Sequence, residues 1–174
     1  MGDQKTGQAQ VSVRVALGEG STLSTGLSVL DHLLGELART ARLKLSVEVA
    51  PGAVDQAVAA AGRSVGEKIA PLLRAPRAVG SGFAWAPADE ALAGVVLEVS
   101  PRPLVASNVD FSGVGGLRSD VVAVFIQELA TGAGLNVHIR VLEGKDPQNV
   151  LSAIFKALGT AIGQACRTPE GGDP

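Results

Sequence analysis

The chain holds few side chains that could perform chemistry, and its only two histidines lie far apart in the sequence. His32 follows Asp31, and His138 stands in an alternating apolar stretch. An imidazole can act as a general acid or base, or bind a metal. Together with Asp31 or Asp55, the two histidines could form only a weak metal site. The structural alternative makes His32 a helix side chain bonded to backbone or a neighbouring carboxylate, and His138 a strand residue on a half-buried face.

Two further features could carry chemistry. Asp89 and Glu90 are adjacent carboxylates, which either form a solvated acidic turn before a strand or belong to a site. Cys166 is the only cysteine, which excludes a disulfide within the chain and a zinc site built from several cysteines. We expect it to be a free thiol on a helix.

The spacing of apolar residues predicts the elements that position these groups. Alternation of apolar with polar or small residues predicts strands, and apolar residues at helical spacing, bounded by Gly and Pro, predict helices. We expect the first strand to continue as a hairpin into Ser21–Thr25, Arg74–Ala86 to be a linker, and Ser119 to cap the helix that it begins. The expected strands are 11–17, 43–49, 95–99, 104–108 and 136–142, the helices are 28–42, 54–73, 119–131 and 147–166, and a polar, glycine-rich loop spans 107–116.

The two halves of the chain repeat each other. Glu36–Ala38 recurs as Glu128–Ala130, and the alternating strand that begins at Leu43 recurs from Leu135 at the same offset. This predicts an α+β fold made of a duplicated half-domain, with two small sheets each covered by helices and packed as an α/β sandwich. The half-repeats are 1–80 and 87–166, and 167–174 is an expected disordered tail.

Composition excludes several classes of function. The chain has 174 residues, of which 46% are hydrophobic, and a formal charge of −2 without a run of Lys or Arg. We therefore expect a soluble globular protein that does not bind nucleic acid. No stretch approaches the ~20 apolar residues that span a bilayer, and the start does not resemble a signal peptide. We expect a cytoplasmic protein without membrane association.

Four segments of the chain match the motifs of one known family. TGLSVLDHLLGELART, at 25–40, resembles TGxxFLDHMLxxxARH, and PADEALAGVVLEVSPRP, at 87–103, resembles PMDEALAxxxxDxSGRP. LNVHIRV, at 135–141, resembles the strand before that family's second metal motif, and FKA, at 155–157, resembles the end of HHxxEAxFKA. By these motifs the chain resembles the imidazoleglycerol-phosphate dehydratase family, a manganese lyase of histidine biosynthesis. The resemblance implies a ribosomal protein S5 domain 2-like fold and a homo-oligomer, either a trimer or a 24-subunit shell.

The family binds manganese through two HHxxE motifs, and neither pair of histidines is present here. When FKA is aligned with the end of HHxxEAxFKA, the second motif falls on Gln148, Asn149 and Ser152. The first motif falls near Asp55, Gln56 and Ala59. Thr40 replaces the histidine of ARH. We therefore expect no manganese cofactor, and His32 and His138 are the residual candidates for metal ligands.

The resemblance also implies roles for other residues. His32, Asp89 and Glu90 match positions expected to be catalytic. Arg102 matches an arginine that contacts the substrate phosphate, and Arg77 lies near the position of a second such arginine. Guanidinium groups are well suited to binding phosphate. Gln8 replaces a glutamate and could hydrogen-bond a substrate hydroxyl.

Three hypotheses follow from these matches. The first is a dehydratase homologue of histidine biosynthesis that has lost all or most of its manganese-dependent activity. The second is an active lyase whose metal site is rebuilt from His32, His138 and acidic residues. The third is a non-catalytic oligomeric binding module for a small phosphorylated metabolite or a protein partner.

Overall fold

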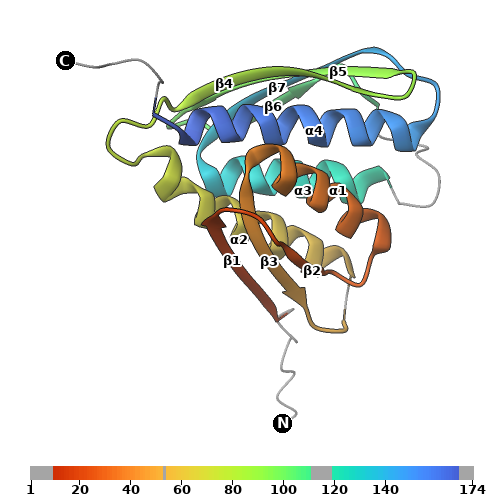
Figure 1. Cartoon of the computed structure of the whole chain (residues 1–174). Helices are drawn as coiled ribbons and strands as arrows, with labels where there is room; N and C mark the ends of the chain where they lie inside the picture. Colours follow the sequence, from red (N-terminus) through yellow and green to blue (C-terminus); the bar gives the residue numbers. More distant parts are fainter. Residues whose placement is uncertain (1–9, 53, 111–118, 169–174) are drawn as a thin grey trace.

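The computed structural model describes residues 10–52, 54–110 and 119–168, and it places four helices between two sheets (Figure 1). The three-stranded sheet contains β1 (Val11–Leu17), β2 (Thr22–Ser24) and β3 (Leu43–Val49). The four-stranded sheet contains β4 (Ser81–Ala88), β5 (Ala91–Val99), β6 (Leu104–Ser107) and β7 (Leu135–Glu143). The helices are α1 (Ser28–Ala41), α2 (Val54–Leu73), α3 (Ser119–Ala133) and α4 (Pro147–Cys166). The expected α+β architecture of two small sheets covered by helices is confirmed.

The two sheets share one pairing scheme. In the three-stranded sheet, β3 lies between β1, which is antiparallel to it, and β2, which is parallel. In the four-stranded sheet, β7 lies between antiparallel β5 and parallel β6. Each central strand is followed by a long helix, α2 or α4. This correspondence supports the proposal that the chain arose by duplication.

Two predictions about the strands are wrong. No hairpin joins β1 to β2, because β3 lies between them. Leu43, Leu45 and Val47 of β3 are at most 1% exposed, so this strand takes the central position, and the three-residue β2 is left at an edge.

The expected linker 74–86 contains most of β4. Its inward residues are alanines, at 84, 86 and 88, whereas Phe83 and Trp85 point outward. Small inward residues are needed because α4 crosses closely, and the backbone of Gly82 lies against that of Ala161. Alanine, glycine and proline are poor strand formers, which is why the segment resembled a loop.

The helices that the sequence predicted are present. Asp146 caps α4 by accepting from the amides of Gln148 and Asn149, and Pro147 occupies the first turn. α3 begins at Ser119, whose side chain lies outside the described part, as do residues 111–118 of the expected glycine-rich loop.

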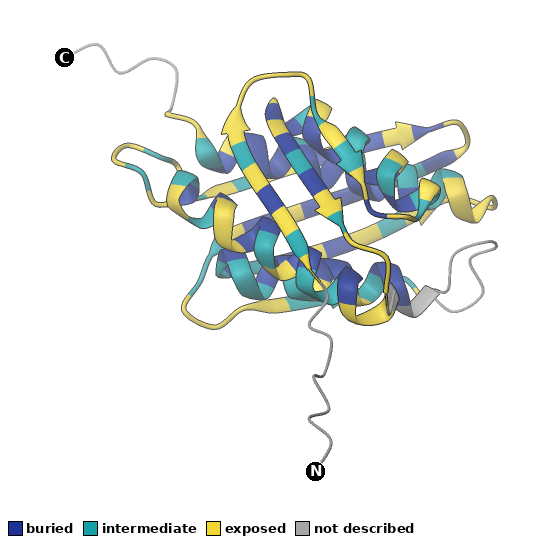
Figure 2. Cartoon of the chain, turned by 90° about the horizontal axis from the view of Figure 1, so that it is seen from below, coloured by how far each residue is buried: buried dark blue, intermediate teal, exposed yellow. Residues whose placement is uncertain are grey.

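The core fills the space between the sheets. Figure 2 shows buried and exposed residues alternating along the three-stranded sheet, whose inner face meets the helices. Phe125 of α3 and Phe155 of α4 are fully buried, with ring centroids 6.3 Å apart. Within the described ranges, no helix is long and apolar enough to cross a membrane.

Arg167 does not belong to the disordered tail that the sequence predicted. Arg167 is fixed, because its carbonyl accepts from the Val79 amide and its guanidinium donates to the Ala41 carbonyl. The prediction of disorder from residue 169 onward falls outside the described residues.

Candidate functional site

The first turns of α1 and α4 enclose a cavity of about 360 Å³. His32 contributes the only imidazole among its lining side chains, and Gln148, Asn149 and Ser152 face it from α4. These three are the residues that the sequence placed at the second metal motif. The first turn of α4 therefore presents two amides and a hydroxyl to the cavity.

Glu90 is fully engaged beside this cavity. Its Oε1 accepts from the backbone amides of Lys145, at 3.1 Å, and Asp146, at 2.8 Å. Its Oε2 accepts from Nδ2 of Asn149 at 2.8 Å. The hydrogen bond from the Asp146 amide, followed by that from Asn149, lowers the pKa of Glu90 from 4.5 to about 2. The carboxylate therefore remains ionised at neutral pH and ties the β4–β5 turn to the start of α4.

The carboxylate of Asp31, which precedes His32, is also engaged. It accepts from the backbone amide and from the hydroxyl of Thr25, at 2.9 and 2.6 Å. These bonds fix the turn that enters α1, whose N-cap residue, Leu27, has no side-chain cap. Asp31 thus serves the turn before the helix.

The side chains at the two motif positions do not fit a manganese ion. At α4, the amide nitrogen of Asn149 donates to Glu90, so this side chain could offer a metal only its neutral carbonyl oxygen and no nitrogen ligand. At the start of α2, Asp55 and Gln56 are exposed and Ala59 offers no donor. Over the described ranges, no cluster of three or more His, Cys, Asp or Glu could hold a metal.

The remaining predicted site residues do not line this cavity. Asp89 forms the β4–β5 turn with Glu90 and adopts a left-handed conformation, with φ of 46°. Arg77 and Arg102 lie near the opposite end of the four-stranded sheet, where Val79 bonds Arg167 and Val99 bonds Gly80. The 20 residues of α4 separate the two ends by about 30 Å. One chain therefore does not bring these arginines to His32 and Glu90.

The conformations of the two arginines also differ. Arg77 is exposed in a turn with φ of 73°. The backbone of Arg102 is held by Ser100, whose hydroxyl accepts from the Arg102 amide and donates to its carbonyl. Both side chains are exposed. Gln8, the third predicted substrate ligand, falls outside the described residues.

His138 lies in a different cavity from His32. It points outward from β7, beside Phe83, Val96 and Asn136, in a hollow of about 560 Å³ on the four-stranded sheet. The two histidines therefore line separate cavities.

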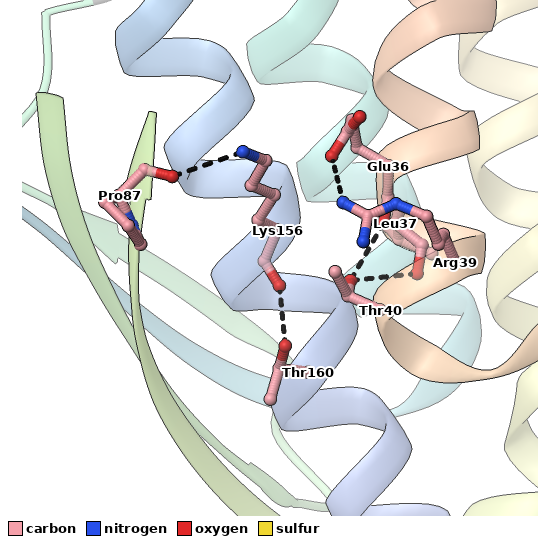
Figure 3. Close-up of polar contacts among 7 residues, drawn as sticks. All are labelled: Glu36, Leu37, Arg39, Thr40, Pro87, Lys156 and Thr160. Carbon is pink, nitrogen blue, oxygen red and sulfur yellow. Dashed lines mark hydrogen bonds and ion pairs between the residues drawn. The ribbon is translucent and has the colours of Figure 1, made fainter. Parts of the chain in front are cut away.

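Figure 3 shows polar contacts within α1 and between α4 and β4 that the sequence did not reveal. Thr40, which the sequence analysis aligned with the histidine of ARH, donates to the carbonyls of Glu36 and Leu37. Lys156 reaches from α4 to the carbonyl of Pro87 on β4, at 3.2 Å. Asp146 was also missed as a cap, although Asp followed by Pro before an apolar helix is a recognisable signal.

Comparisons with known proteins agree on one family. Residues 25–162 match the family model of imidazoleglycerol-phosphate dehydratase. Proteins of that name from Clostridium botulinum (strain Kyoto / Type A2) and Heliobacterium modesticaldum are similar. The first is 32% identical over 93% of this chain and 87% of its own length. The second is 35% identical over 82% of this chain and 76% of its own length.

Solved structures show the same similarity. The crystal structure of imidazoleglycerol-phosphate dehydratase from Staphylococcus aureus covers 92% of this chain, with 95% of its own length matched, a TM-score of 0.84 and 27% identity. The Pyrococcus furiosus structure, in complex with (S)-C348, has a TM-score of 0.84 at 24% identity, covers 96% of this chain with 94% of its own length matched, and shows the shared fold.

Proposed function

Because the chain belongs to the imidazoleglycerol-phosphate dehydratase family, we propose that it is a homologue in which manganese-dependent dehydration is lost or much reduced. The observation that carries this proposal is the hydrogen bond from Asn149 to Glu90. Through this bond the side-chain amide of Asn149, a residue aligned with the second metal motif, is held by the carboxylate of Glu90. A hydrogen bond within the chain thus occupies groups that a metal site would need free.

The chemistry of the remaining side chains supports the same conclusion. Removal of water beside an imidazole requires stabilisation of developing negative charge, often the largest catalytic contribution. The cavity of His32 offers one imidazole, and a lone general acid or base contributes about 10²- to 10⁴-fold. Glu90 and Asp146 also place two carboxylates at the start of α4, which disfavours a phosphorylated ligand there.

The alternative of an active lyase with a rebuilt metal site requires more than one copy of the chain. His32 and His138 line separate cavities. A site using both would have to combine His32 of one copy with His138 of another. The third alternative, a binding module for a small phosphorylated metabolite or a protein partner, would use the exposed Arg77 or Arg102. Under each hypothesis we place the protein in the cytoplasm, without a nucleic-acid partner.

Turnover of imidazoleglycerol phosphate tests the proposal. Purified chain is incubated with substrate and excess Mn²⁺, beside a family member that carries both HHxxE motifs. We expect a rate at least about 10⁴-fold below that of the control enzyme, since the charge-stabilising group is missing. Turnover within tenfold of the control enzyme would overturn the proposal and favour a rebuilt site.

A further inference from the structure

A hollow on the four-stranded sheet has the size of a small-molecule site. Its volume is about 560 Å³, and such sites typically occupy about 300–1,000 Å³. Residues of β4, β5 and β7 line it, together with Gln164 of α4. None of the residues that line the His32 cavity takes part, so the two cavities are separate.

The side chain of Asn136, on β7, leaves an acceptor without a donor. Its Oδ1 is buried and accepts no hydrogen bond from any described residue. Buried polar atoms are nearly always hydrogen-bonded, so an exception requires an explanation. Asn136 lines the hollow, where a donor on a bound molecule can reach this oxygen once the amide turns about its last side-chain bond. The unpaired acceptor therefore favours a ligand that donates hydrogen bonds.

Glu98, on β5, brings a negative charge to the same place. It lies opposite Asn136 in the antiparallel pair of β5 and β7. Side chains opposite each other in such a pair have Cβ atoms about 4.5–5.5 Å apart, so one ligand group can contact both. Glu98 is exposed and has no ion pair within the described ranges. The carboxylate and the amide oxygen thus offer adjacent acceptors to a cation, and an ammonium has three N–H donors.

Apolar side chains border these acceptors. Phe83 is 65% exposed and lies opposite Val96, which is 59% exposed. The Phe83 amide donates to Oε1 of Gln164 at 3.0 Å, which ties β4 to α4 beside the hollow. The face of an aromatic ring attracts a cation within about 6 Å. Among the described residues that line the hollow, only His138 can carry a positive charge, so the lining favours a cation over an anion.

We propose that this hollow binds a small organic cation in which a primary ammonium is attached to an apolar group. The ammonium lies between Glu98 and Asn136, and the apolar group lies against Phe83 and Val96. The carboxylate disfavours an anion, such as a phosphorylated metabolite, in the same hollow. This inference does not depend on the loss of dehydration.

Isothermal titration calorimetry with 2-phenylethylammonium chloride tests the proposal. We expect saturable binding of one molecule per chain, and Glu98→Gln to weaken it at least about tenfold, because the substitution removes the charge and keeps the shape. The matched control is Glu48→Gln, at an exposed carboxylate of β3, which should bind as wild type does. The uncharged analogue 2-phenylethanol should bind at least about tenfold more weakly than the ammonium. No saturable binding of the ammonium through the millimolar range, equal binding of the alcohol, or an unchanged affinity in Glu98→Gln would overturn the proposal.

Asn136→Leu tests the unpaired acceptor with a second readout. Replacing an unpartnered polar group by an apolar one of similar shape does not destabilise a fold, so we expect a melting temperature no lower than that of wild type. Binding of 2-phenylethylammonium should nevertheless weaken at least about fivefold, because one acceptor is lost. Wild-type affinity in this variant would contradict the proposed position of the ammonium.

Discussion

Glu90, which the sequence analysis named as a candidate site residue, has a structural role in this fold. Its carboxylate accepts two backbone amides and the Asn149 side chain, and so joins the β4–β5 turn to α4. Gln148, Asn149 and Ser152, which the register of FKA assigned to the second metal motif, line one cavity together with His32. The hydrogen bonds of Glu90 could not be predicted, because they depend on how the turn meets the helix.

The first prediction concerns the pH dependence of stability. The folded chain lowers the pKa of Glu90 from 4.5 to about 2, so its ionised form stabilises the fold above pH 4.5. That contribution is lost as the pH falls toward 2. We expect Glu90→Gln to lower the free energy of unfolding at pH 7 and to flatten its decline between pH 4.5 and 2. Urea unfolding at several pH values measures both.

Glu48→Gln is the matched control, since Glu48 is an exposed carboxylate on the three-stranded sheet. It should follow the wild-type curve. A Glu90→Gln curve parallel to wild type throughout this range would show that the hydrogen bonds of Glu90 do not stabilise the fold.

At the scale of elements, glycines set the distance between paired helices. In the α1–α4 pair, a Cβ added at Gly159 would collide with the hydroxyl of Thr40 and the carbonyl of Leu37. In the α2–α3 pair, Gly62 and Gly132 approach backbone carbonyls of the facing helix in the same way. Close backbone approach is therefore common to both helix pairs.

We expect Gly159→Ala to destabilise the chain by about 1–3 kcal/mol, because a rigid backbone atom must move to admit the methyl group. Gly35→Ala is the matched control within α1. There the nearest atom to the new Cβ is the Leu23 side chain at 3.7 Å, so alanine should stabilise the helix by about 0.5–1 kcal/mol. Chemical unfolding of both variants measures the difference. Equal effects would contradict this account of the crossing.

The sequence predicted the elements whose apolar spacing is regular and missed those shaped by tertiary packing. All four helices were found, and β3 was placed correctly, because large aliphatic residues mark their buried faces. β4 was not found, since its inward residues are alanines that admit α4. The pairing of β2 with β3 was missed because a parallel contact across a helix leaves no local signal.

For the molecule as a whole, the layers determine which groups can meet. The cavity of His32 and the exposed arginines, Arg77 and Arg102, lie at opposite ends of the four-stranded sheet, and His138 lies on its outer face. The sequence could suggest each residue through its motif. The sequence could not give the distance between the His32 cavity and the two arginines, because that distance depends on how β4, β5 and α4 run in the folded chain.

The central claim is that this member of the family does not hold the metal used by its relatives. Its most direct test is the manganese content of the purified chain, measured by inductively coupled plasma mass spectrometry after incubation with Mn²⁺ and desalting. A family member with both HHxxE motifs serves as the control. We expect far less than one ion per chain, because amide and hydroxyl groups line the cavity at the start of α4, where the register of FKA places the second metal motif. One or more retained ions per chain would contradict the account.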